Sequence, residues 1–149
     1  MPSDYAGPDP IPPAARRDWR YRRSDNLCAV LLGRLPQYLL RAEGLAVVVA
    51  ALTVYFYADY TWWLVVVLAL APDLSLIGFA LNQRVGTAAY NAVHTYAVPL
   101  LLGAVGVVAE ADLAVQVALI WIMHIGVDRA IGYGLKYPTG FKDTHLQRV

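Results

Sequence analysis

The chain has 149 residues, a length that fits a single domain. Hydrophobic residues make up 58% and charged residues only 15%, against the roughly 25% charged residues of ordinary soluble domains, so a membrane protein is expected. The formal net charge of +1 gives no reason to expect nucleic acid as a partner, and the single cysteine, Cys28, excludes an intrachain disulfide.

The first 26 residues differ in composition from the rest of the chain. They contain five of the nine prolines and five arginines, a composition that cannot build a core and predicts a disordered arm. No early apolar stretch typical of a signal peptide is visible. Residues 27–37 are amphipathic and predict a short helix that lies flat at a membrane interface.

Four apolar runs follow, each about as long as the roughly 20 residues that a helix needs to cross a bilayer. They are residues 38–58, 61–81, 86–109 and 113–135. The connectors between them are very short, so consecutive helices should be antiparallel neighbours. The predicted fold class is therefore all-α, with residues 38–135 forming a compact bundle of four transmembrane helices.

The distribution of charge predicts the orientation of this bundle. Seven of the twelve Lys and Arg residues precede or begin the first run, Arg84 lies in the second connector, and the remaining four lie at or after the end of the last run. The first and third connectors carry Asp59, Glu110 and Asp112 instead. By the positive-inside rule, both termini should lie in the cytoplasm and the protein in the inner (plasma) membrane.

Ionisable side chains inside the apolar runs fall at a common depth when each helical residue rises about 1.5 Å. They are Asp73, His94, His124 and Asp128. Because each such group costs roughly 2.5–3.5 kcal/mol on insertion scales, ionisable side chains in membranes usually face the protein interior and pair with one another. We therefore predict one pocket facing the cytoplasm, with Arg129 or Arg41 balancing its charge. A purely structural polar network between the helices is the alternative.

Two prolines interrupt the predicted helices beside this polar layer. Pro72 and Pro99 each lack an amide hydrogen and would free the carbonyl one turn back, on Leu68 and Thr95. Kinks at these positions would open space next to the layer. Prolines that are merely tolerated in membrane helices are equally compatible with the sequence.

The tail, residues 136–149, is polar and is predicted on the cytoplasmic side. Pro138-Thr139-Gly140 predicts a turn. Such a turn would let Asp143 and His145 fold back over the mouth of the bundle, whereas a loose polar tail is the alternative.

Several stretches resemble a family of small bacterial integral-membrane proteins known only as a domain of unknown function. The stretches are RAEGLAVVVAAL, APDLSLIGF, YNAVHTYAVPLLL and HIGVDRAIGYGLKYPTGFKDTHL, and the resemblance covers about residues 39–148. It implies a four-helix membrane protein and no particular reaction. The characteristic polar positions that it implies are Glu43, Asp73, Asn91, His94, His124, Asp128, Arg129, Lys136, Asp143 and His145.

The first functional hypothesis is a membrane-embedded enzyme that performs acid/base chemistry. Two carboxylates and two imidazoles supply an acid and a base, so the expected catalytic residues are Asp73, His94, His124 and Asp128. A lipid or isoprenoid substrate is expected, in a cyclase- or isomerase-like reaction, within a pocket lined by Tyr90, Tyr96, Trp121 and Tyr133. The expected binding residues are Glu43, Tyr90, Asn91, Arg129, Tyr133, Lys136, Asp143 and His145.

Two other hypotheses stay open. In the second, His94 and His124 bind a divalent metal together with one or both of the aspartates, Asp128 in the first place, although the chain has no HExxH or paired ExxH motif. In the third, the protein is a proton-coupled carrier or a small subunit of a membrane complex. Transport through only four helices would favour a homo-oligomer.

Overall fold

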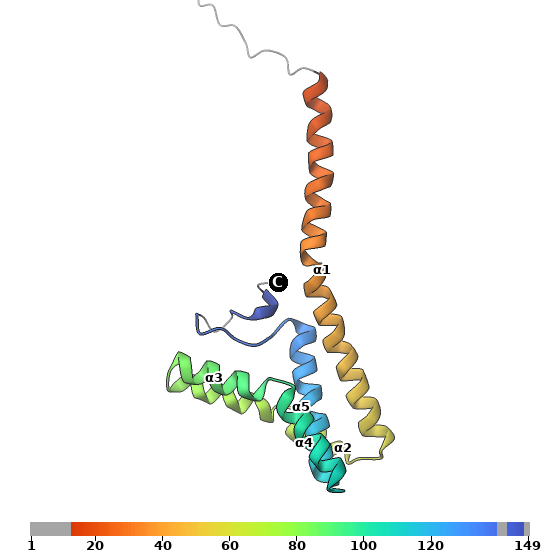
Figure 1. The fold of residues 1–149 in the computed structure, drawn as a ribbon, viewed down its shortest axis with the longest axis vertical. Helices are drawn as coiled ribbons and strands as arrows, with labels where there is room; N and C mark the ends of the chain where they lie inside the picture. Colours follow the sequence, from red (N-terminus) through yellow and green to blue (C-terminus); the bar gives the residue numbers. More distant parts are fainter. Residues whose placement is uncertain (1–12, 140–142, 148–149) are drawn as a thin grey trace, which may run out of the picture. The chain divides into compact units, whose positions relative to one another are not determined.

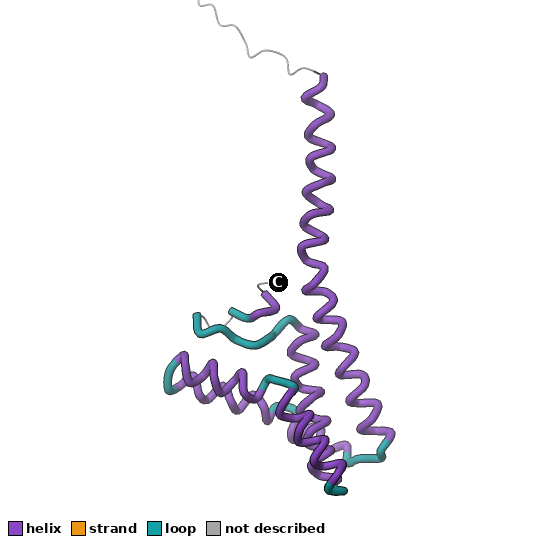
Figure 2. The backbone as a smooth tube through the Cα atoms, viewed as in Figure 1, coloured by secondary structure: helices purple, strands orange, loops and turns teal. Residues whose placement is uncertain are grey.

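The computed structural model describes residues 13–139 and 143–147, with side chains from Leu32 onward. These residues form helices, turns and loops and contain no β-strand (Figure 2). The elements in chain order are α1 (Pro13–Tyr57), α2 (Trp62–Leu68), the 3-10 helix η1 (Ala71–Ala80), α3 (Gln83–Val93), α4 (Ala97–Val108), α5 (Asp112–Ile131) and the 3-10 turn η2 (His145–Gln147). The chain divides into two units, Met1–Leu35 and Pro36–Val149.

The described part of the first unit is helical. Helix α1 begins at Pro13, so residues 13–26 are helical where disorder was expected, and residues 27–37 continue the same helix instead of forming a separate one. Alanine, arginine and leucine are good helix formers, and proline suits the first helical position because its missing amide hydrogen needs no partner there. The remainder of the expected arm, residues 1–12, lies outside the described residues.

Four helical segments are long and apolar enough to cross a membrane. They are Leu32–Tyr57, Trp62–Ala80, Gln83–Val108 and Asp112–Ile131, in agreement with the four apolar runs of the sequence. Large apolar side chains such as Val66, Leu70 and Ile77 are about two-thirds exposed. A surface of this kind is unfavourable in water and suits contact with lipid.

The second and third apolar segments are broken, unlike the uninterrupted helices that the sequence predicts. The second is divided into α2 and η1, and the third into α3 and α4. Helices η1 and α3 lie side by side, and this pair turns away from the direction of α2, α4 and α5 (Figure 1). The polar residues at the two breaks are thereby brought against the middle of α5.

Small residues allow the helices of the second unit to approach closely. A Cβ atom added at Gly44 of α1 would lie 2.7 Å from Arg129 Cβ and 2.8 Å from the Ala130 amide nitrogen. One added at Gly126 of α5 would lie 2.8 Å from Val48 Cγ2. Close packing through glycines is typical of helix pairs in membranes, where apolar burial gives little driving force for association.

The tail folds back after α5 ends. Gly132 adopts a φ of 99°, and its amide donates to the Arg129 carbonyl, while the Tyr133 amide donates to the Asp128 carbonyl. This left-handed glycine cap turns the chain sharply. Lys136 and Thr144 then form a single β-bridge, and both side chains are buried.

Candidate functional site

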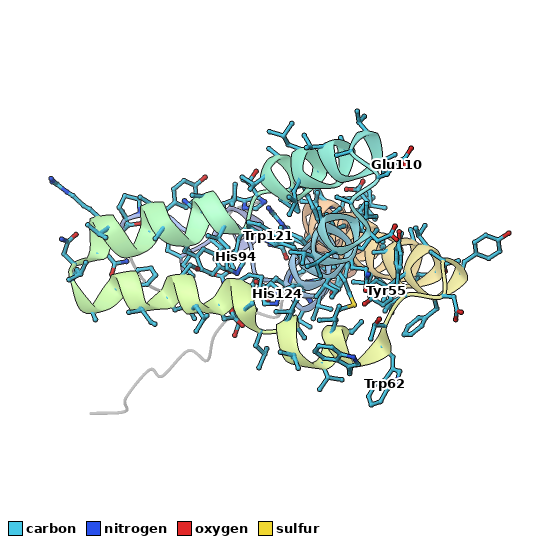
Figure 3. The ribbon with its side chains drawn as sticks, turned by 90° about the horizontal axis from the view of Figure 1, so that it is seen from below. Tyr55, Trp62, His94, Glu110, Trp121 and His124 are labelled. Carbon is cyan, nitrogen blue, oxygen red and sulfur yellow. The ribbon has the colours of Figure 1, made fainter. Side chains whose placement is uncertain are left out.

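Two buried histidines meet where the broken segments contact α5. His94 directly follows α3 and is 2% exposed, whereas His124 lies within α5 and is 7% exposed. Their Nε2 atoms are 3.3 Å apart. Figure 3 labels both side chains, which come from neighbouring elements and lie close to Trp121.

Backbone carbonyls determine which nitrogen of each ring carries the hydrogen. His94 Nδ1 lies 2.9 Å from the Tyr90 carbonyl oxygen, and His124 Nδ1 lies 2.7 Å from the Ala69 carbonyl oxygen. Because a carbonyl oxygen only accepts, both Nδ1 atoms must be the donors. In the neutral rings each Nε2 atom therefore carries a lone pair and no hydrogen, and the two Nε2 atoms face one another.

The Ala69 carbonyl oxygen can accept the hydrogen bond from His124 because of Pro72. In the 3-10 helix η1 each amide donates three residues back, as the Asp73 amide does to Leu70. Pro72 has no amide hydrogen to donate to Ala69, so the Ala69 carbonyl accepts from His124 instead. The expected free carbonyl was that of Leu68, which would be correct only if the segment continued as an α-helix.

At the second break, between α3 and α4, a side chain of α5 also donates a hydrogen bond to a backbone carbonyl. The indole Nε1–H of Trp121 donates to the Val93 carbonyl over 2.7 Å, at the end of α3. Pro99, which was expected to free Thr95, lies in the first turn of α4, where amides have no helical partner. Both breaks are therefore stabilised by side chains of α5, one of which also belongs to the histidine pair.

Two carboxylates complete the cluster. Asp73 Oδ1 lies 3.6 Å from both Nε2 atoms, and Asp128 Oδ2 lies 3.5 Å from His94 Nε2 and 4.0 Å from His124 Nε2. The ligand atoms of Asp73, His94 and His124 all lie within 4.8 Å of one another. For metal–ligand bonds of about 2.0–2.2 Å, the edges of a tetrahedral site measure roughly 3.3–3.6 Å, close to most of these separations.

Tyr90 joins the carboxylate, the histidine and a lysine. Its hydroxyl donates to Asp128 Oδ2 over 3.0 Å. Its ring stacks on His94 with 3.7 Å between centroids and 12° between planes, and Lys136 Nζ lies 4.4 Å from the Tyr90 centroid. Because His94 covers one face of the ring, the opposite face is the one that receives the ammonium group.

Lys136 is held in place through its backbone. Its amide donates to Asn91 Oδ1 over 2.7 Å, and its carbonyl accepts from Asn91 Nδ2 over 2.8 Å. Burial lowers the pKa of Lys136, and the negative charges of Asp128 and Asp73 act in the opposite direction. Asn91 thus positions the tail rather than entering the cluster, and Lys136 supplies the cation expected from Arg129 or Arg41.

A cavity of about 480 Å³ opens beside the cluster. Its polar or aromatic lining includes Asp73, Tyr90, His124, Asp128, Tyr133 and Lys136. The rest of the lining is mainly apolar and includes Leu70 and Ile131, whose side chains are 70% and 59% exposed on the outer surface. The cavity therefore combines the two carboxylates with exposed apolar side chains.

The other predicted binding residues lie elsewhere. Glu43 and Arg129 line a separate cavity of about 300 Å³, together with Tyr96. The guanidinium of Arg129 contacts the His145 ring, and the Asp143 carboxylate accepts from the Thr139 hydroxyl within the tail. The cluster therefore contains the four predicted catalytic residues, whereas Glu43, Arg129, Asp143 and His145 do not join it.

Comparison with known protein families shows which family the chain belongs to. A family model described as "Domain of unknown function (DUF4260)" matches residues 37–149. The chain belongs to this family. The match contains every candidate site residue of the DUF4260 domain and confirms the resemblance drawn from the sequence motifs. No curated protein and no solved structure matches the chain.

A first prediction concerns the attachment of the tail in the DUF4260 domain. Replacing Asn91 by alanine is expected to accelerate hydrogen exchange of the Lys136 amide strongly, because a buried donor and acceptor lose their partners at about 1–3 kcal/mol each. The exposed substitution Gln147→Ala is the control. Unchanged exchange at Lys136 in the Asn91 variant would contradict this role.

A second prediction concerns pH. Burial, and then the charge of Arg129, lower the pKa of His145, so docking of the tail favours the neutral ring. The unfolded tail has a histidine pKa of about 6.5, so docking should weaken as the pH falls through that value and stay constant above it. Hydrogen exchange of the Leu135–His145 segment between about pH 5.5 and 7.5 measures this, and His145→Gln should remove the dependence.

Proposed function

We propose that this DUF4260 protein is a membrane-embedded metalloenzyme, in which a divalent transition-metal ion assists acid/base chemistry on a lipophilic substrate. The observation that carries the proposal is the convergence of two bare imidazole nitrogens, 3.3 Å apart, on two aspartate oxygens. Two lone pairs that face one another in a buried site repel unless a cation or a proton lies between them.

The histidines have the surroundings of metal ligands. A ligating histidine almost always donates its other ring hydrogen to a carboxylate, carbonyl or water, which orients the ring and raises its basicity. The Tyr90 carbonyl oxygen accepts this hydrogen bond from His94, and the Ala69 carbonyl oxygen accepts it from His124. Together with Asp73, the pair makes a two-histidine, one-carboxylate set that leaves further positions open.

The second carboxylate suits the transfer of a proton. Asp128 Oδ2 accepts from the Tyr90 hydroxyl and also borders the cavity. An ion held by His94, His124 and Asp73 would polarise an oxygen of the substrate or of water, with Asp128 as the neighbouring base. Proton transfer of this kind is common to isomerisation, cyclisation and hydrolysis.

The lipophilic nature of the substrate follows from the cavity. Its wall includes Leu70, Val127 and Ile131, which are also exposed on the apolar surface. A substrate dissolved in the bilayer would reach the carboxylates without crossing water. A lipid or isoprenoid is the class of molecule with this property.

A metal-free acid/base enzyme is the second candidate. It is favoured by the same short distance, because two imidazoles 3.3 Å apart can share one proton. In that case His94 and His124 would themselves transfer protons, with Asp73 and Asp128 stabilising the charged form.

Elemental analysis of protein purified in neutral detergent distinguishes the two candidates. One divalent transition-metal ion per chain is expected, with loss of the ion in Asp73→Asn. Asp143→Asn is the matched control and should retain the ion, since that carboxylate contacts Thr139 in the tail. Folded wild-type protein that neither contains nor takes up zinc, iron, manganese or cobalt would rule out the metalloenzyme.

A further inference from the structure

We propose that the substrate is an amphiphile with an anionic head group, phosphate or carboxylate, and that Lys136 binds this group beside the metal. The inference rests on the proposed function and names its substrate class. It is carried by the placement of one buried lysine on the wall of the cavity that also contains the carboxylates.

Lys136 is held in position by its backbone and by contacts of its ammonium group with aromatic rings. Its backbone is bonded twice to Asn91 of α3, and it pairs with Thr144 in the β-bridge. Its ammonium group lies over Tyr90, 4.4 Å from the centroid, and 5.2 Å from the centroid of Phe79. A residue that is 93% buried and held by these contacts has little freedom to move out to solvent.

The balance of charge favours an anion. Among the described residues that line the cavity, Asp73 and Asp128 contribute two negative charges and Lys136 one positive charge, so with the proposed divalent ion these groups sum to about +1. Arg129 faces His145 and lines the other cavity. An anionic group between the ion and the ammonium would neutralise this charge.

The size and lining of the cavity suit the apolar chain of the proposed amphiphile. Its volume of about 480 Å³ falls within the roughly 300–1,000 Å³ typical of small-molecule sites. Lys136 and the carboxylates line this cavity together with Val127 and Ile131, which are 43% and 59% exposed. An anionic head group would contact the lysine, and an alkyl chain would contact the apolar part of the lining.

Calorimetric titration of metal-loaded protein in neutral detergent tests the inference, with dodecyl phosphate, dodecanoate, dodecanol and inorganic phosphate as probes. Both anionic amphiphiles should bind at least about tenfold more tightly than dodecanol. Inorganic phosphate should bind at least about tenfold more weakly than dodecyl phosphate, because it lacks the chain. Equal binding of dodecanol, or equal binding of inorganic phosphate, would overturn the inference.

Variants assign the effect to the lysine. Lys136→Met should lose the preference for anionic probes and keep its metal, and Lys136→Arg should retain the preference. Arg84→Met, at an exposed position in the first turn of α3, should behave as wild type. If Lys136→Met does not fold, Lys136→Gln replaces it. A folded variant that still prefers the anions contradicts the role of Lys136. Elemental analysis of the same samples shows separately whether the metal proposal has failed.

Discussion

Replacing His124 by asparagine is expected to lower the affinity for the divalent ion by more than about 100-fold, because even supporting contacts around a metal contribute 10–100-fold. The amide nitrogen of asparagine occupies nearly the position of histidine Nδ1, so the hydrogen bond to the Ala69 carbonyl is retained. The Nε2 ligand is lost. The substitution thus separates metal binding from stabilisation of the break between α2 and η1.

The complementary variant is Trp121→Phe. It removes the donor to the Val93 carbonyl and should destabilise the fold by about 1–3 kcal/mol without changing metal content. Metal content is measured by elemental analysis, and stability by denaturant titration in detergent. If His124→Asn binds the ion as tightly as wild type while folded, His124 is not a ligand and the metal-free acid/base mechanism is favoured.

Replacing Gly126 by valine is expected to destabilise the second unit by at least about 2–3 kcal/mol, the upper range for overpacking. The added Cβ would lie 2.8 Å from Val48 Cγ2 and 3.0 Å from the Gly44 carbonyl oxygen. Because the Gly44 contact is with backbone, rotation of a side chain cannot relieve it. Helix α1 would have to move away from α5, the helix that carries His124 and Asp128.

A matched control exists on the same face-to-face pair of helices. Ala46 of α1 is exposed, so Ala46→Val adds a similar volume without entering the α1–α5 contact. Its stability should stay within about 0.5 kcal/mol of wild type. Equal stability of the Gly126 and Ala46 variants, measured by denaturant titration in the same detergent, would show that close packing at Gly126 contributes nothing.

The cluster of ionisable residues was predictable because depth along a helix depends only on counting. A rise of about 1.5 Å per residue gives Asp73, His94, His124 and Asp128 a similar level in three of the four predicted antiparallel helices. This reasoning does not identify partners. Asn91 and Arg129 lie at plausible positions as well, yet one binds the backbone of Lys136 and the other contacts His145.

The role of Pro72 could be predicted from the sequence only in part. Pro72 predicts a free carbonyl, but which carbonyl depends on whether the helix is α or 3-10, and the structure has η1 as a 3-10 helix. That difference moves the acceptor from Leu68 to Ala69. Only then does His124 find its hydrogen-bond partner and expose Nε2.

Sequence alone determined the all-helical class, the four apolar segments and the residues that form the polar layer, because hydropathy and helical rise are local properties. Tertiary structure decided the breaks in the second and third segments, the placement of Lys136 over Tyr90 and the exclusion of Arg129 from the cluster. These features depend on hydrogen bonds between residues such as His124 and Ala69, or Asn91 and Lys136, which are 55 and 45 positions apart. No local pattern records such pairs, since the donor and acceptor meet only when the helices pack.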